Sequence, residues 1–239
     1  MFFAFIRIST FLSVCKSIFP QGTPNTFKVL FSLMLSTLAA SNLNLDIVTD
    51  DMYTVIVYTV TEVLNGFFLG TVTSLVLNTI KIAGSLIDTQ IGLSMANIYD
   101  PQSGEQTTVI QSFLYWFAIA LFFSTNGHHL LLNGIFTSFE SIPIGTAPIV
   151  NNLDYFIKIF LQQFAIGFQI AFPILFTLIL SEAILGLISR SVPQLNVMLI
   201  GMPLKLLIGV VVLIVSISLL GNEIKQMIYS LPKILNGYM

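Results

Sequence analysis

The residues best placed to do chemistry in this sequence are charged side chains inside long apolar stretches. They are Glu62, Lys81, Asp88, Glu182, Arg190 and Lys205. A charge at the centre of a membrane helix costs roughly 2.5–3.5 kcal/mol on insertion scales, so each should pair with an opposite charge, pair with a partner chain or face water. Their scatter along the chain favours pairing over the substrate pathway of a transporter. We expect at least one carboxylate–cation pair among Glu182, Arg190 and Lys205, or with a partner.

Enzyme and metal signatures are weak. The stretch 92–96, Gly-Leu-Ser-Met-Ala, superficially resembles a nucleophile elbow, but that motif needs a strand–turn–helix and a histidine partner. His128 and His129 are neighbours, and neighbours on a helix point about 100° apart, so they chelate one metal poorly. The single cysteine, Cys15, forms no disulfide framework or zinc cluster. We therefore expect a protein that is not an enzyme and that needs no cofactor or metal.

The composition indicates a membrane protein. Hydrophobic residues make up 55% of the chain and charged residues 8%, and the mean hydropathy is +0.92. A soluble domain has about 25% charged residues, so this chain cannot cover a water-facing surface with charge. The net charge of −2 lacks the concentrated basic face that nucleic acid requires, so nucleic acid is not expected as a partner.

The apolar stretches that position these residues are long enough for several helices. A spanning helix needs about 20 largely apolar residues, and six regions qualify or come close. They are residues 2–19, 27–40, 52–98, 109–123, 155–188 and 195–220. The third is too long for one simple span, so it is a broken helix, an extended helix or a hairpin. A separate amphipathic helix is expected at 223–235, with lysines on its polar side.

Small residues on these helices predict close helix packing. Gly84, Asp88, Gly92 and Ala96 are spaced by four, which on a helix forms a ridge that another backbone can approach closely. Gly66 and Gly70 repeat the device, and Gln90 lies beside the longer ridge. We expect these positions to contact other helices in this chain or in partner chains.

Two long motifs resemble a known family. The first runs from Gly84-Ser-Leu-Ile-Asp88 through 104, and the second is Arg190-Ser-Val-Pro-Gln-Leu-Asn through Lys205. Within the second, the motif residues are Pro193, Gln194, Asn196, Gly201 and Pro203. Residues 123–129 and 142–145 fit the same pattern. The chain is similar, over nearly its whole length, to the FliR/SctT family of type III export gate components.

The resemblance implies an all-α membrane protein with about six to eight apolar helices in hairpins. It implies one export-gate domain over 1–239, in which a P-like part, 1–150, precedes a Q-like helical hairpin, 151–239. Such a protein is a non-catalytic part of the flagellar type III export gate and of its protein-conducting channel. The implied partners are FliP, FliQ and FlhB-type components, unfolded flagellar proteins and membrane lipid. The implied location is the bacterial inner membrane, at the flagellar basal body.

The polar break at 97–108 is the expected gate. Pro101 cannot donate a backbone hydrogen bond and Gly104 allows the chain to reverse, so the apolar helices stop here. Non-helical backbone at membrane depth is tolerated where it is buried in protein or lines a water-filled cavity, and the family resemblance implies a plug. The predicted plug residues are Ile98, Tyr99, Asp100, Pro101, Gln102, Ser103, Gly104, Glu105 and Gln106.

Three alternatives remain open. An injectisome homologue would deliver effectors instead of flagellar subunits. A small-molecule transporter would also have broken helices and charges within the membrane. The third alternative, a membrane enzyme, lacks a recognisable acid–base or nucleophile set.

Overall fold

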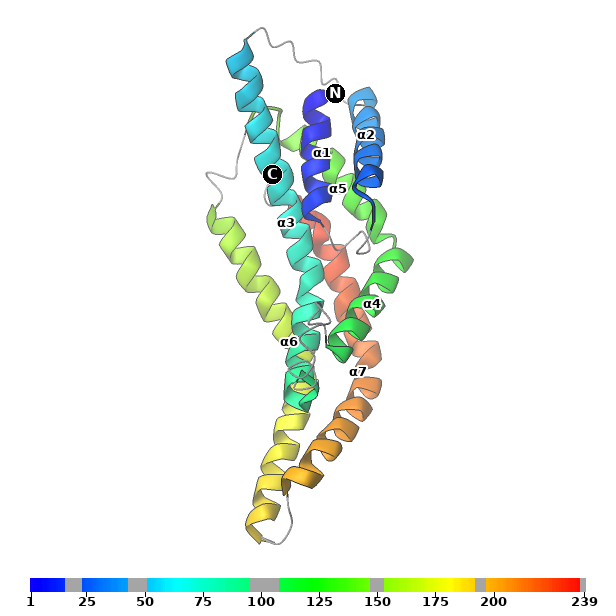
Figure 1. Cartoon of the computed structure of the whole chain (residues 1–239), viewed down its shortest axis with the longest axis vertical. Helices are drawn as coiled ribbons and strands as arrows, with labels where there is room; N and C mark the ends of the chain where they lie inside the picture. The colour runs from blue at the N-terminus through cyan, green and yellow to red at the C-terminus, as the bar shows by residue number, and fades with distance from the viewer. Residues whose placement is uncertain (16–22, 43–50, 95–107, 147–152, 192–196, 237–239) are drawn as a thin grey trace. The chain divides into compact units, whose positions relative to one another are not determined.

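The computed structural model describes residues 1–15, 23–42, 51–94, 108–146, 153–191 and 197–236. These residues form seven helices and no strand, as Figure 1 shows. The helices are α1 (Phe2–Val14), α2 (Asn25–Asn42), α3 (Met52–Ile91), α4 (Val109–Ser124), α5 (Gly127–Ser141), α6 (Leu153–Ser191) and α7 (Val197–Asn236). The expected all-helical fold class is confirmed.

Three of the described helices are long and apolar enough to cross a membrane. They are α3, α6 and α7, and a fourth span is possible if the bent pair α4 and α5 forms one. This confirms that the chain is a membrane protein. Within the most apolar 18-residue stretches of α6 and α7, this chain buries 28% and 17% of the residues, so most residues of these two stretches are not buried by the chain itself.

The long region 52–98 resolves into one extended helix that ends early. Of the alternatives left open by the sequence, the structure has a continuous α3 of 40 residues. It ends at Ile91 because Gly92 takes a φ of 94°, a left-handed backbone that glycine adopts without steric strain. The expected helical ridge therefore stops at Asp88: Gly92 lies past the helix end, and Ala96 lies outside the described residues.

One other expected boundary was wrong, and one helix was not expected. A separate helix at 223–235 does not exist, because α7 continues through Gly221 as one helix of 40 residues. Gly221 packs on α4, where a Cβ would lie 3.5 Å from Cζ of Phe117. The helix α5 was also not anticipated; the chain turns between α4 and α5 at Asn126, whose φ is 58°. Asparagine tolerates this left-handed conformation better than most residues.

The chain divides into two compact units that interleave along the sequence. Unit 1 comprises Met1–Asn78, Asn126–Leu161 and Ile228–Met239, and unit 2 comprises Thr79–Thr125 and Gln162–Met227. The long helices α3, α6 and α7 contribute to both. The division into a P-like part and a Q-like part near residue 150 remains a proposal.

Unit 1 is built on close contacts made by α1. This helix lies beside α2 (Figure 1) and buries Phe3, Ile8 and Phe11. The predicted pair of glycines, Gly66 and Gly70, faces it from α3. A Cβ at Gly66 would collide with the carbonyl oxygen of Arg7. A Cβ at Gly70 would lie 2.9 Å from the carbonyl oxygen of Phe11. Glycine is therefore required at both positions by the distance between the helices.

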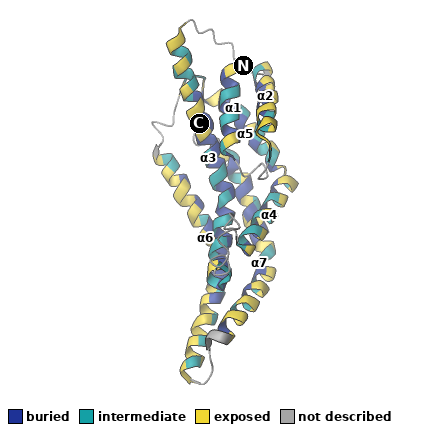
Figure 2. Cartoon of the chain, viewed as in Figure 1, coloured by how far each residue is buried: buried dark blue, intermediate teal, exposed yellow. Residues whose placement is uncertain are grey.

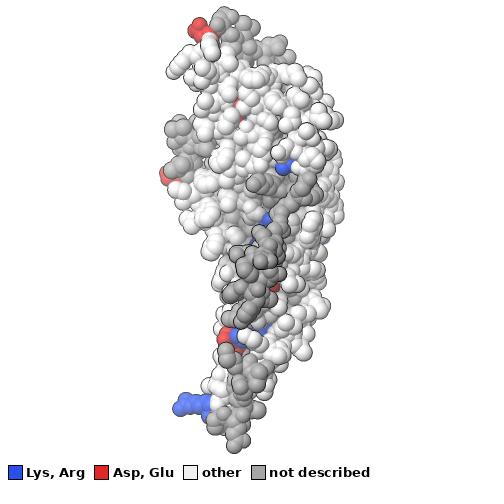
Figure 3. Space-filling view, viewed as in Figure 1, with Lys and Arg blue, Asp and Glu red and all other residues white. Residues whose placement is uncertain are grey.

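Much of the molecular surface is apolar. Few of the described atoms visible in Figure 3 belong to Lys, Arg, Asp or Glu, and Figure 2 shows exposed residues recurring along α6 and α7, many of which are large and apolar. Large exposed apolar patches mark contact with lipid or with other proteins. The fold thus leaves a substantial apolar surface for contact with lipid or with other proteins.

Candidate functional site

Arg7 and Glu62 form a fully buried ion pair in unit 1. Arg7 Nε donates to Glu62 Oε2 over 2.6 Å, Arg7 Nη2 donates to Oε1 over 2.9 Å, and both side chains are 0% exposed. This bidentate geometry matches the planar guanidinium to the carboxylate and gives strong, directional bonds. Arg7 is thus the partner that Glu62 was expected to have, although the sequence alone did not identify it.

The same arginine closes the C-terminal end of α5. Its Nη1 donates to the Ser138 carbonyl over 2.8 Å, and its Nη2 donates to the Ile142 carbonyl over 3.1 Å. The guanidinium also lies 4.3 Å from the ring centroid of Phe139. The C-terminal end of a helix carries partial negative charge, and its last carbonyls lack partners within the helix. The Ile142 carbonyl lies at this end, whereas the Ser138 carbonyl also accepts a hydrogen bond from the Ile142 amide over 3.0 Å, so the arginine adds a second bond to it. A buried cation therefore satisfies this helix end.

Asp88 performs the opposite task in unit 2, at the N-terminal end of α4. Its Oδ1 accepts a hydrogen bond from the Ile110 amide over 3.2 Å, and its Oδ2 accepts one from the Gln111 amide over 2.8 Å. Oδ2 also accepts from the Thr108 hydroxyl. These amides belong to the first turn, where helix donors lack partners. Asp88, itself fully buried, thus caps α4 from the neighbouring helix.

Gly84 brings α3 close enough for this cap. It lies one turn before Asp88 on α3, and a Cβ there would collide with Cα of Gln111. The predicted Gly84–Asp88 ridge therefore contacts another helix of this chain, α4. Gly92 does not extend the contact among the described residues, because a Cβ built there meets none of their atoms within 4 Å beyond its chain neighbours.

The third polar cluster joins three helices of unit 2 and is partly exposed. Lys205 Nζ on α7 lies 2.9 Å from Glu182 Oε1 on α6, and Gln90 Nε2 on α3 donates to Glu182 Oε2 over 3.2 Å. The Lys205 and Glu182 side chains are 20% and 56% exposed. Glu182 is thus paired but not buried by this chain, and its burial in an assembly remains a prediction.

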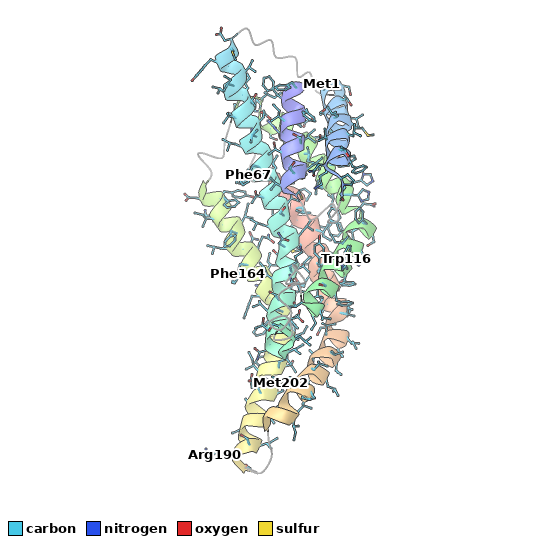
Figure 4. The ribbon with its side chains drawn as sticks, viewed as in Figure 1. Met1, Phe67, Trp116, Phe164, Arg190 and Met202 are labelled. Atoms are coloured by element: carbon cyan, nitrogen blue, oxygen red, sulfur yellow. The ribbon has the colours of Figure 1, made fainter. Side chains whose placement is uncertain are left out.

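The other predicted charges have different surroundings. Lys81 Nζ lies 4.2 Å from the ring centroid of Tyr115, a cation–π contact between α3 and α4. Arg190 is exposed near the end of α6, as Figure 4 shows. This chain therefore does not bury Arg190.

Part of the family motif lies within the described residues. Gly201 is buried with a built Cβ 3.7 Å from Cδ1 of Leu185, and Pro203 lines an open apolar groove with Ile91, Met202 and Leu206. Pro193, Gln194 and Asn196 lie outside the described residues. All nine predicted plug residues, Ile98 through Gln106, also lie outside them, so the plug remains a prediction.

The described residues contain no group of three or more His, Cys, Asp or Glu side chains that could hold a metal ion. Sequence analysis missed Arg7 as the partner of Glu62, and Thr108 and Gln111 as partners of Asp88. One signal was available: Arg7 interrupts an apolar helix, and few carboxylates lie in apolar stretches to neutralise it. Which of them it meets depends on packing between residues 55 positions apart.

These observations define an all-helical membrane protein whose buried charges close helix ends. The chain belongs to the family described as bacterial export proteins, family 1, which matches residues 1–231.

The similar proteins all carry one name. A flagellar biosynthetic protein FliR of Bacillus subtilis (strain 168) is 36% identical over 222 residues, covering 90% of this chain and 85% of the relative. The FliR of Aquifex aeolicus (strain VF5) is 28% identical over 219 residues, covering 91% and 84%. The FliR of Escherichia coli (strain K12) is 28% identical over 210 residues, covering 87% and 80%. Family and relatives together support a component of flagellar protein export.

Proposed function

We propose that this chain is a non-catalytic component of the flagellar type III protein export gate, and that it forms part of the channel through which unfolded flagellar proteins pass. The observation that carries the proposal is the family match over residues 1–231. The proposed partners are FliP, FliQ and FlhB-type components, in the bacterial inner membrane at the flagellar basal body.

The structure offers two supports for this proposal. The buried Arg7 is paired with Glu62 and bonds the C-terminal end of α5, and the buried Asp88 bonds the N-terminal end of α4. Buried charges that are held in this way suit a scaffold better than an ion or substrate pathway. The most apolar stretches of α6 and α7 have few residues buried by this chain, 28% and 17%, which suits membership of a larger assembly in a membrane.

The function is tested by deleting the gene and measuring secretion. We expect loss of the external filament and of secreted hook subunits, with normal growth, and recovery of both when the intact chain is supplied. A deletion strain that still swims and secretes hook subunits would refute the proposal. Copurification of this chain with FliP, FliQ and FlhB-type proteins separates an export gate from a small-molecule transporter, which needs no such assembly.

Segment 97–108 is proposed to restrict passage through the gate. Removing residues 102–106 should leave the complex assembled but make membranes leaky to ions or small solutes. The measurement is solute leakage and growth when the deletion is expressed with its partner components. A tight membrane together with a normal yield of complex would mean that the segment only connects α3 to α4.

A further inference from the structure

The residues that follow α5 form a short turn that lies against α3 in unit 1. The Thr146 amide donates to the Pro143 carbonyl over 3.2 Å, and Gly145 has a φ of 88°. A glycine with a positive φ at the third position of a four-residue turn is typical of a type II turn. Residues 142–146, which include this turn, are called the strap below.

Two side chains of α3, about one turn apart, hold the backbone of the strap. Glu62 Oε1 accepts a hydrogen bond from the Gly145 amide over 3.3 Å, and Asn65 Nδ2 donates to the Thr146 carbonyl over 2.8 Å. One turn earlier on α3, the ring of Tyr58 lies where a Cβ at Gly145 would collide with it. The strap therefore depends on polar groups of α3 and on the absence of a side chain at residue 145.

Two of these α3 residues also contact α1. Glu62 receives two hydrogen bonds from the Arg7 guanidinium, which donates as well to the Ile142 carbonyl at the start of the strap. The Tyr58 ring, which packs on the strap, lies 5.7 Å from the Phe3 ring of α1, centroid to centroid. The strap and α1 are thus joined directly through Arg7 and indirectly through Glu62 and Tyr58.

Opening either element would expose or unpair groups that the other element needs. If α1 separated from α3, Glu62 would lose its cation while the strap still covered it, in a site where its side chain is 0% exposed. A buried carboxylate without a cation is costly, so hydration of Glu62 would favour opening of the strap as well. If the strap opened first, Arg7 would lose the Ile142 carbonyl, and water reaching the ion pair would weaken its attraction.

We propose that α1 and the strap open and close as one unit, a clasp around the Arg7–Glu62 pair. Coupling between two parts of a protein is reciprocal, so a change that loosens the strap should also loosen α1. Such local opening requires less free energy than global unfolding. The clasp involves unit 1 alone, and its coupling is independent of any role in export.

The single cysteine of the chain, Cys15, reports whether α1 is in place. It directly follows α1 and is 0% exposed, so it should react with a thiol reagent mainly when α1 opens. Gly145→Ala places a methyl group against the Tyr58 ring and forces a positive φ on alanine, which should open the strap without changing α1 itself. In the purified full chain in detergent, we expect Cys15 labelling to be about tenfold faster, from the strain of that backbone conformation. Labelling at the wild-type rate would overturn the proposal.

Gly84→Ala is the matched control, because it also forces a methyl group into a tight contact, but in unit 2. It should leave Cys15 labelling near the wild-type rate. Equal acceleration by Gly84→Ala and Gly145→Ala would mean that Cys15 reacts through general unfolding, which would overturn the proposal. Asn65→Ala removes one hydrogen bond from the strap and should give a smaller, several-fold acceleration, so the test holds even if Gly145→Ala does not fold.

The reverse direction is tested by hydrogen exchange in Arg7→Met. Exchange of the Gly145 and Thr146 amides should accelerate more than exchange of the Gln111 amide, which lies in unit 2. The same acceleration at all three amides, or no acceleration in the strap, would overturn the coupling between the strap and α1.

Discussion

Removing Arg7 should destabilise the protein far more than removing an exposed cation. In Arg7→Met, Glu62 stays in a site that is 0% exposed, loses both guanidinium bonds and keeps the Gly145 amide, 3.3 Å away, as a donor. The carbonyls of Ser138 and Ile142 lose their arginine donor as well. Breaking a buried pair by removing one partner typically costs about 3–5 kcal/mol, which is a factor of more than about 100 in the folding equilibrium.

The Lys205–Glu182 pair provides a matched control. Its side chains are 20% and 56% exposed, and exposed pairs contribute about 0–1 kcal/mol. Lys205→Met should therefore lower stability by about 1 kcal/mol or less. The assay titrates the solubilised full chain, purified without partner proteins, with a denaturing detergent and follows its protease-resistant fraction, because the exposure of the control pair is that of the chain alone.

A double-mutant cycle separates the pair from its surroundings. Glu62→Leu alone leaves Arg7 buried without its carboxylate and should cost a similar about 3–5 kcal/mol. If the two groups act as a unit, Arg7→Met/Glu62→Leu costs well under the sum of the single changes. Additive losses, or an Arg7→Met variant as stable as Lys205→Met, would refute the conclusion that Arg7 and Glu62 stabilise the fold as one buried pair.

Three further substitutions follow from the other contacts. Asp88→Asn should lower stability by about 1–3 kcal/mol in the same assay, because the amide turns a donor toward the backbone amides of α4; equal stability would mean that the cap is dispensable. Gly84→Ala should reduce recovery of folded protein. Gly186→Ala on α6, where a built Cβ meets no atom of the described residues that pack on it within 4 Å, should be neutral or stabilising by about 0.4–1 kcal/mol, so the two yields should differ. Glu182→Gln should retain more secretion than Glu182→Leu, because the amide still accepts from Gln90; identical secretion would argue against a polar role.

The fold class follows from composition and from the spacing of apolar residues. The scarcity of charge predicts a membrane protein, and the apolar runs predict the described helices other than α5. Helix ends were harder to place. Gly92 ends α3 although its spacing from Gly84 and Asp88 suits a continuing ridge, since sequence spacing does not fix the sign of φ. Conversely, Gly221 does not break α7, because packing against Phe117 favours the continuous helix.

The pairing of the charges could be predicted only in part. Sequence reasoning required partners for Glu62 and Asp88 but could not choose them, because the partners come from other helices. Asp88 meets backbone amides of α4, 22 and 23 positions away, and backbone donors leave no mark in the residue types. The Lys205–Glu182 pair lies within the set that was expected to contain one, since few opposite charges occur in that part of the chain.

The signs of the two buried helix-end charges explain why an apolar chain retains them. The N-terminal end of a helix carries partial positive charge and the C-terminal end carries partial negative charge. Asp88, an anion, lies at the N-terminal end of α4, and Arg7, a cation, lies at the C-terminal end of α5. Each charge complements its helix end. Arg7 takes the place of water at the Ile142 carbonyl, and Asp88 does so at the Ile110 and Gln111 amides. A residue that carries ions or protons must exchange partners during each cycle, whereas each of these charges bonds two backbone groups at once. Exchanging them would open a helix end in apolar surroundings, so their arrangement favours a permanent structural role over transport by these residues.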